Sequence, residues 1–230
     1  MKGYISQYKK SSGKNVVEED IFRLIYRNTL KDCFELIEDG YKDYLVCSEK
    51  VILADETAIT AGIYGKIETI IKAKTLPFDI TPEFFVYSDK IKKGDISPKK
   101  ARRFDLRILT WNERNEKFSF GVEAKLLAET NYKTKVASYL IREYVEDAGM
   151  GKFIKKIYDP FSYNEGLMLG HIMNGNKKNI VKKINNKITN TYSTNEHLEE
   201  YNKYYVSSYM EEGKKRNLYH ILLDFSSLFN

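Results

Sequence analysis

Cysteine is scarce in this chain, and long apolar runs are absent from it. The two cysteines, Cys33 and Cys47, have neither CxxC spacing nor a histidine cluster nearby, which gives no support to a zinc site or a disulfide framework. Residues 1–14 are polar and lack the apolar stretch of a secretory signal, and no apolar run approaches the roughly 18 residues that a membrane-spanning helix needs. We therefore expect a cytoplasmic protein without a membrane partner.

Charged residues of both signs are abundant. The 230 residues include 38 Lys and Arg against 32 Asp and Glu, a net charge of +6, and 42% of all residues are hydrophobic. This composition predicts a packed core under a heavily solvated surface and requires no large disordered region. The basic balance fits a polyanionic partner such as nucleic acid, although many lysine-rich bacterial proteins are basic without binding one.

Hydrophobic periodicity predicts helices in the first third of the chain and again after its middle. Apolar residues at three- and four-residue intervals predict a helix over 16–39 that ends at Gly40. Asp55 and Glu56 offer the start of a second helix, which continues to about residue 73. Residues 133–145 and 152–157 are also expected to be helical, whereas the Asn- and Lys-rich region 174–205 reflects genome composition as readily as function.

Short apolar runs predict strands, and Pro77 and Pro82 predict a loop before the first long ones. We expect an α/β fold, in which a central mixed β-sheet of about four or five strands is flanked by helices on both faces. The expected strands are one or two within 44–53, then 83–88, 103–111 and 117–127, a strand or helix start over 166–172, and a closing strand within 218–229.

Residues 118–125, FSFGVEAK, carry the most informative pattern. Strand alternation places the apolar residues on one face and puts Glu123 and Lys125 side by side on the other. On the preceding strand Asp105 points away from its apolar neighbours, and a hairpin between the two strands would bring Asp105 close to Glu123. Two such carboxylates repel each other unless a cation lies between them. Mg²⁺ fits, because it takes oxygen ligands and commonly uses one or two carboxylates together with substrate phosphate.

Asp105, seventeen intervening residues and then Glu123-Ala124-Lys125 on an apolar strand resemble the signature of the PD-(D/E)xK nuclease superfamily, over roughly residues 55–144. Phe104 stands where the family name has proline. A second ExK, Glu212-Gly213-Lys214, lies in a charged stretch without alternation.

The resemblance implies a restriction-endonuclease-like fold over 1–230, with 1–50 as an N-terminal helical extension and 51–172 as the catalytic core. It also implies a Mg²⁺-dependent endonuclease, with Mn²⁺ able to substitute, that hydrolyses double-stranded DNA. Asp105 and Glu123 would bind the metal and Lys125 would assist the nucleophile. Members often have a further acid on a helix before the sheet, for which Glu56 is the first choice and Glu68 the second.

Several alternatives remain open at this point. Asp105, Glu123 and Lys125 would also suit an exposed sheet face with cross-strand ion pairs, which Arg103 and Arg107 could join. Glu56 would equally complement a helix dipole. An RNA-directed nuclease, or a non-catalytic nucleic-acid-binding subunit of a larger complex, would use the same residues.

Two further features bear on substrate and partners. Lys99, Lys100, Arg102 and Arg103 lead directly into Asp105 and are candidates for contacts to nucleic-acid phosphates. Downstream segments, among them Lys152-Phe153-Ile154 and the stretch that ends at His171, resemble a pattern in uncharacterised bacterial nuclease-like proteins, some tied to anti-phage defence. His171 could be a phosphate contact or a proton carrier, although a lone histidine is more often structural. Cleavage of both strands would favour a homodimer, and a defence-complex partner protein is a further possibility.

Overall fold

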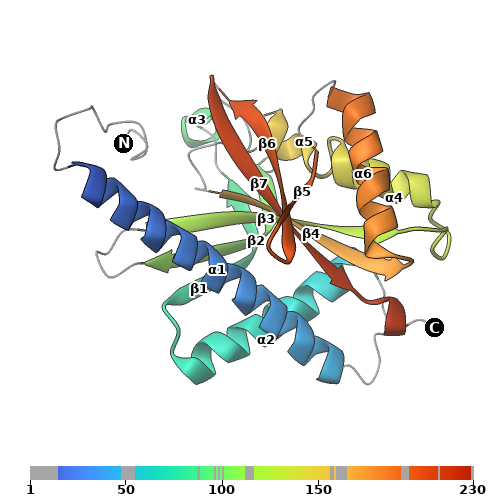
Figure 1. Ribbon diagram of the computed structural model, residues 1–230, viewed down its shortest axis with the longest axis horizontal. Coiled ribbons are helices and arrows are strands. Elements are labelled where there is room, and N and C mark those ends of the chain that lie inside the picture. The colour runs from blue at the N-terminus through green and yellow to red at the C-terminus, as the bar shows by residue number, and fades with distance from the viewer. Residues whose placement is uncertain are drawn as a thin grey trace.

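The protein is built around a seven-stranded mixed sheet (Figure 1). The computed structural model describes residues 15–47, 55–86, 89–95, 97, 99, 101–111, 117–155, 158, 165–192, 197–211 and 213–228. The sheet has the order β1-β2-β3-β4-β7-β6-β5; β3 and β7 are both parallel to β4, and the other neighbouring strands are antiparallel. The elements are α1 (Asn15–Cys47), α2 (Glu56–Lys74), β1 (Phe78–Val86), α3 (Asp89–Lys92), β2 (Arg102–Trp111), β3 (Lys117–Ala128), α4 (Ala137–Val145), α5 (Gly151–Ile154), β4 (Glu165–Asn174), α6 (Lys177–Tyr192), β5 (Glu199–Tyr201), β6 (Tyr204–Glu211), β7 (Lys214–Asp224) and a 3-10 turn (Ser226–Leu228).

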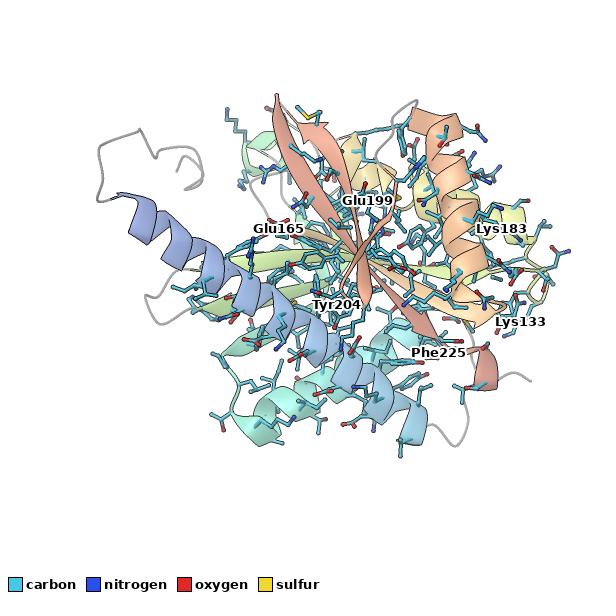
Figure 2. The ribbon with its side chains drawn as sticks, in the orientation of Figure 1. Lys133, Glu165, Lys183, Glu199, Tyr204 and Phe225 are labelled. Carbon is cyan, nitrogen blue, oxygen red and sulfur yellow. The ribbon has the colours of Figure 1, made fainter. Side chains whose placement is uncertain are left out.

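Helices cover both faces of this sheet, as the sequence predicts, although the predicted four or five strands are too few. On one face α1 and α2 pack over the strands: the Phe34 ring meets the Tyr204 ring edge-on at 4.8 Å, and Tyr41 meets Phe225 at 5.1 Å. Figure 2 shows Tyr204 and Phe225 along the course of α1. On the other face α6 buries Ile180, and α4 lies beside α6. Each face therefore has its own apolar core.

The first predicted helix is confirmed, but it does not end at Gly40. α1 continues to Cys47. The missing side chain at Gly40 lets α2 approach α1 closely, since a Cβ there would lie 2.4 Å from Cγ1 of Ile67. The predicted strand within 44–53 is wrong for residues 44–47, which are helical, and 48–54 lie outside the described residues. The second helix is confirmed, and Asp55 caps it by accepting a 2.7 Å hydrogen bond from the Ala58 N–H.

The strand predictions are confirmed for β2, β3, β4 and β7, with one error before them. Pro82 does not mark a loop, because β1 begins at Phe78 and pairs with β2 through Pro82. β1 is an edge strand of the sheet, where a proline is tolerated. Residues 112–116 of the expected hairpin turn lie outside the described residues, as do 87–88.

Region 174–205 proves to be more than a compositional feature. It contains α6, whose isoleucines at a spacing of four residues are buried while most of its lysines face solvent, and it also contributes β5 and the start of β6. The helix predicted over 133–145 begins only at Ala137, and the one over 152–157 is the single turn α5, with 156–157 outside the described residues. In the described part of the chain, no helix is both long and apolar enough to cross a membrane.

Candidate active site

The sheet divides at the two acids that the sequence singles out. β2 pairs with β3 from Trp111 and Lys117 up to Leu106 and Val122, and no further. β2 nevertheless stays paired with β1 as far as Arg102. Asp105 and Glu123 are the next residues after the last β2–β3 pair, so they stand opposite each other where the strands separate. Beyond this point the backbones of β2 and β3 no longer bond to each other, which leaves room between the strands for the two acidic side chains.

Asp105 closes part of this opening. Its Oδ2 accepts a 2.7 Å hydrogen bond from the backbone N–H of Ala124, at a level where β2 no longer pairs with β3. Burial raises the pKa of the Asp105 carboxyl, and the nearby Glu123 charge raises it further, to about 6, against the opposing influence of Lys125. An acid held in this way binds either a proton or another cation more readily than a solvated aspartate does.

Glu123 is completely buried, and both of its oxygens accept hydrogen bonds. Lys125 donates to Oε1 over 2.9 Å, and Lys152 of α5 donates to the same oxygen. The Tyr158 hydroxyl donates to Oε2 and lies 2.8 Å from the carbonyl of Arg103; having one proton, it donates to one of the two at a time. The buried negative charge of Glu123 is thus matched by two ammonium groups.

Lys125 connects Glu123 to Glu56, the first residue of α2. Its Nζ donates to Glu56 Oε1 over 2.7 Å, to Glu123 Oε1 and to the Ala124 carbonyl over 2.6 Å. Burial lowers the pKa of Lys125, but Glu123, Glu56 and Asp105 raise it more, so the net pKa lies above its usual value. The ammonium is therefore charged at neutral pH. All four residues predicted to form the site, Glu56, Asp105, Glu123 and Lys125, meet in one cluster.

The other two candidate residues, Glu68 and His171, do not belong to this cluster of ion pairs. Glu68 follows Glu56 by about three turns of helix, and it pairs with Lys72 at 3.2 Å. His171 is fully buried, with Nε2 3.1 Å from the Thr60 hydroxyl, and burial together with the Lys125 charge lowers its pKa to about 3. A neutral, enclosed imidazole of this kind suits a structural role better than proton transfer at neutral pH.

Sequence reasoning did not identify Lys152 and Tyr158 as site residues. They follow Glu123 by 29 and 35 residues. Lys152 lies in the downstream segment Lys152-Phe153-Ile154, but that resemblance assigned it no role, and no motif pointed to Tyr158. Tyr158 is held in place by aromatic packing, with its ring centroid 4.0 Å from that of Phe104 and 5.2 Å from that of Phe153. Phe104 in turn occupies the space above Gly121, where a Cβ would come within 2.5 Å of the ring.

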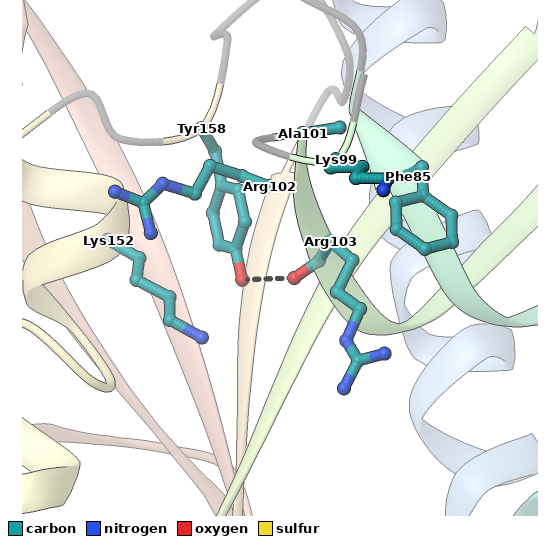
Figure 3. Close-up of a pocket in the computed structure, with 7 residues that line it drawn as sticks. All are labelled: Phe85, Lys99, Ala101, Arg102, Arg103, Lys152 and Tyr158. Atoms are coloured by element: carbon teal, nitrogen blue, oxygen red, sulfur yellow. Dashed lines mark hydrogen bonds between the residues drawn. The ribbon is translucent and has the colours of Figure 1, made fainter. Parts of the chain in front are cut away.

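A cavity of about 280 Å³ adjoins the cluster (Figure 3). Lys152 and Tyr158 lie on one side of it and Phe85 on the other. Arg103, which lines it, also pairs with Glu83 at 3.2 Å. Lys100 lies outside the described residues, so the structure places three of the four predicted phosphate-binding residues. Those that line the cavity are Lys99, Arg102 and Arg103.

The donor set of the cluster fits a hard divalent cation. Within the described ranges no group of three or more His, Cys, Asp or Glu residues could hold a metal by itself. Mg²⁺ does not require one, because it commonly uses one or two carboxylates and completes its shell with water and substrate phosphate. The three acids Glu56, Asp105 and Glu123 outnumber the two ammonium groups of Lys125 and Lys152, which leaves an excess negative charge when all are ionised. Asp105 and Glu123 would hold the ion.

Comparison of the chain with family models, with curated proteins and with solved structures finds no match.

Proposed function

We propose that the protein is a Mg²⁺-dependent nuclease of the PD-(D/E)xK superfamily, with a restriction-endonuclease-like fold, that hydrolyses phosphodiester bonds in DNA. One observation carries the proposal: Asp105, Glu123 and Lys125 meet where β2 separates from β3. An adjoining cavity lined by cations supports it, because the substrate backbone is an anion. The mixed sheet with helices on both faces is compatible with the proposed fold.

Each residue of the cluster has a distinct part in this proposal. The chemistry that Mg²⁺ supplies when bound is polarisation of the scissile phosphate and a lowered pKa of water. Asp105 and Glu123 hold the ion. Lys125 is charged and enclosed by acids, so it acts as a fixed positive charge that positions the water or offsets charge developing on the phosphate, and it does not act as a base. Glu56 orients Lys125 by accepting its hydrogen bond.

A second candidate function is a nucleic-acid-binding subunit without catalysis. The observation that favours it is the pairing of Glu123, whose two oxygens are already served by Lys125, Lys152 and Tyr158. In this reading the cluster is a structural ion network and binds no metal. Mg²⁺ binding by the full chain separates the two candidates, because only the nuclease requires the acid pair to bind the cation.

The deciding experiment is digestion of supercoiled plasmid, linear single-stranded DNA and RNA by the full chain with Mg²⁺, with Mn²⁺ and with EDTA. We expect metal-dependent cleavage of DNA that Asp105→Asn abolishes while the melting temperature stays close to that of the wild type. Asp79→Asn is the matched control, because Asp79 is exposed on the neighbouring strand β1. Cleavage of RNA alone would change the substrate but keep the chemistry. Full activity of Asp105→Asn would overturn the assignment, and nucleic-acid binding with neither cleavage nor Mg²⁺ binding would favour the binding subunit.

A further inference from the structure

Lys152 contacts both the acidic cluster and the neighbouring cavity. Its ammonium donates to Oε1 of Glu123, inside the acidic cluster, and its side chain also lines the neighbouring cavity. It is 23% exposed, whereas Glu123 is fully enclosed, so Lys152 can turn toward solvent without unpacking the core. It stands on the single-turn helix α5 and approaches the Tyr158 ring at 5.7 Å. No other residue that lines the cavity has a described ion pair with Glu123.

The cavity has the character of a phosphate site. Four of the residues that line it are cationic and none is acidic, so an anion there would be attracted and would meet no lining carboxylate. Its volume of about 280 Å³ lies just below the usual range of small-ligand pockets and is far too small for a duplex. One phosphate group with part of its nucleotide is the unit of nucleic acid that it can hold. The 45% exposed ring of Phe85 offers a surface for the attached base.

We propose that this cavity binds one phosphate group of the nucleic-acid chain next to the scissile bond, and that Lys152 couples its occupancy to cation binding at Asp105 and Glu123. The inference rests on the proposed function, because it takes the acid pair as the cation site. Lys152 holds Glu123 while both sites are empty. A divalent cation on Glu123 repels the Lys152 ammonium, and a phosphate in the cavity attracts it, so each ligand favours the other.

This arrangement predicts reciprocal coupling between the two ligands. A cation that displaces Lys152 from Glu123 leaves the ammonium available to the phosphate, and a phosphate that binds Lys152 removes a competitor from Glu123. Thermodynamic linkage requires that both affinities change by the same factor. Lys152 is therefore a positioning residue, and its loss changes the two binding steps in opposite directions.

The test measures Mn²⁺ binding to the full chain from the electron paramagnetic resonance signal of free Mn²⁺. The titration is made with and without a single-stranded hexanucleotide whose phosphorothioate linkages resist hydrolysis. For the wild type we expect the oligonucleotide to tighten Mn²⁺ binding about fivefold or more. In Lys152→Met, Mn²⁺ alone should bind more tightly than in the wild type, since a competing charge is gone, and the effect of the oligonucleotide should shrink at least about threefold.

Two further variants keep the outcome interpretable. Lys155→Met is the matched control, because Lys155 follows α5, is exposed and pairs with Asp147, so it should retain wild-type coupling. Arg102→Met removes a cation of the cavity that has no described bond to Glu123; it should weaken oligonucleotide binding and leave Mn²⁺ affinity unchanged. Unchanged coupling in a folded Lys152→Met would overturn this inference and leave the nuclease proposal standing. If Asp105→Asn instead bound Mn²⁺ as tightly as the wild type, and the oligonucleotide changed Mn²⁺ affinity in none of the proteins, Asp105 and Glu123 would not be the cation site.

Discussion

Single residues in the site depend on one another because the charges are buried together. Lys125 is 9% exposed and Glu123 fully enclosed, and removal of one partner from such a network leaves the other without compensation. Broken buried pairs of this kind typically cost about 3–5 kcal/mol. Substitution of Lys125 or Glu123 therefore affects both stability and chemistry, and a useful test must separate the two effects.

Lys125→Met should lower the melting temperature in EDTA and recover part of that loss when Mg²⁺ is added. The metal replaces the lost positive charge between the acids, and a ligand that binds only the folded state stabilises it. The cleavage rate should fall far more than Mg²⁺ or DNA affinity, as expected for a contact strongest in the transition state. Thermal melting with and without Mg²⁺, together with single-turnover cleavage, checks both points. A normal rate in a destabilised variant would restrict Lys125 to a structural ion pair.

Gly121→Ala should destabilise the protein by about 1–3 kcal/mol, as overpacked core positions do. The added Cβ would come within 2.5 Å of the Phe104 ring, which supports the Tyr158 ring beside Glu123. Gly65→Ala is the control: nothing lies within 4 Å of its Cβ on α2, and alanine is the better helix former. Urea unfolding of the two variants measures the difference, and equal stabilities would show that Phe104 has room to move.

At the scale of elements, α1 is tied to the sheet by an acid that pairs with a tyrosine. The Tyr26 hydroxyl of α1 donates to Glu165, the first residue of β4. Burial raises the pKa of the Glu165 carboxyl to about 7, although the Tyr26 hydrogen bond and the Arg216 charge act in the other direction. Attachment of this helix should therefore depend on pH.

The direction of that dependence follows from the raised pKa. A carboxyl that binds its proton more tightly in the folded state stabilises the fold below its unfolded pKa of about 4.3 and loses that contribution as pH rises through about 7. The wild type should lose melting temperature relative to Glu165→Gln between about pH 5 and pH 8, because the amide does not titrate. Glu199→Gln, on the exposed strand β5, is the control and should follow the wild type. Parallel curves for all three proteins would contradict the prediction.

At the scale of the whole molecule, the net charge of +6 matters less than where cations gather. Reversal of Lys99, Lys100, Arg102 and Arg103 to glutamate should weaken DNA binding by about the same factor for every sequence, because phosphate contacts carry no sequence information. The slope of the logarithm of affinity against the logarithm of salt concentration should become shallower by about one unit for each phosphate contact that is lost. Filter binding at several salt concentrations measures this. Reversal of Lys178 and Lys182, exposed on α6, is the control, and a larger effect there would move the binding surface to α6.

Much of the fold could be predicted from local patterns. α2 follows from its Asp55 cap and its isoleucines at a spacing of four residues, and β2 and β3 follow from alternation. Predictions failed where distant contacts override local preference. Gly40 predicted the end of a helix, but in the structure it lies inside α1 and permits close packing against Ile67. Pro82 predicted a loop, but it lies in the edge strand β1. The spacing of isoleucines in α6 was a local signal that the abundance of Asn and Lys obscured.

The sequence by itself determined the acid pair, Lys125 and Glu56 as the cluster to test, because strand alternation and the start of a helix fix where those side chains begin. Only the tertiary structure decided that β2 leaves β3 at this level, which gives the acids room to meet. It alone added Lys152 and Tyr158, since contacts between residues 29 and 35 positions apart depend on how α5 and the residues after it fold back onto the sheet. Local periodicity reports which face a side chain occupies, whereas charge neutralisation within a buried cluster depends on every segment that reaches it.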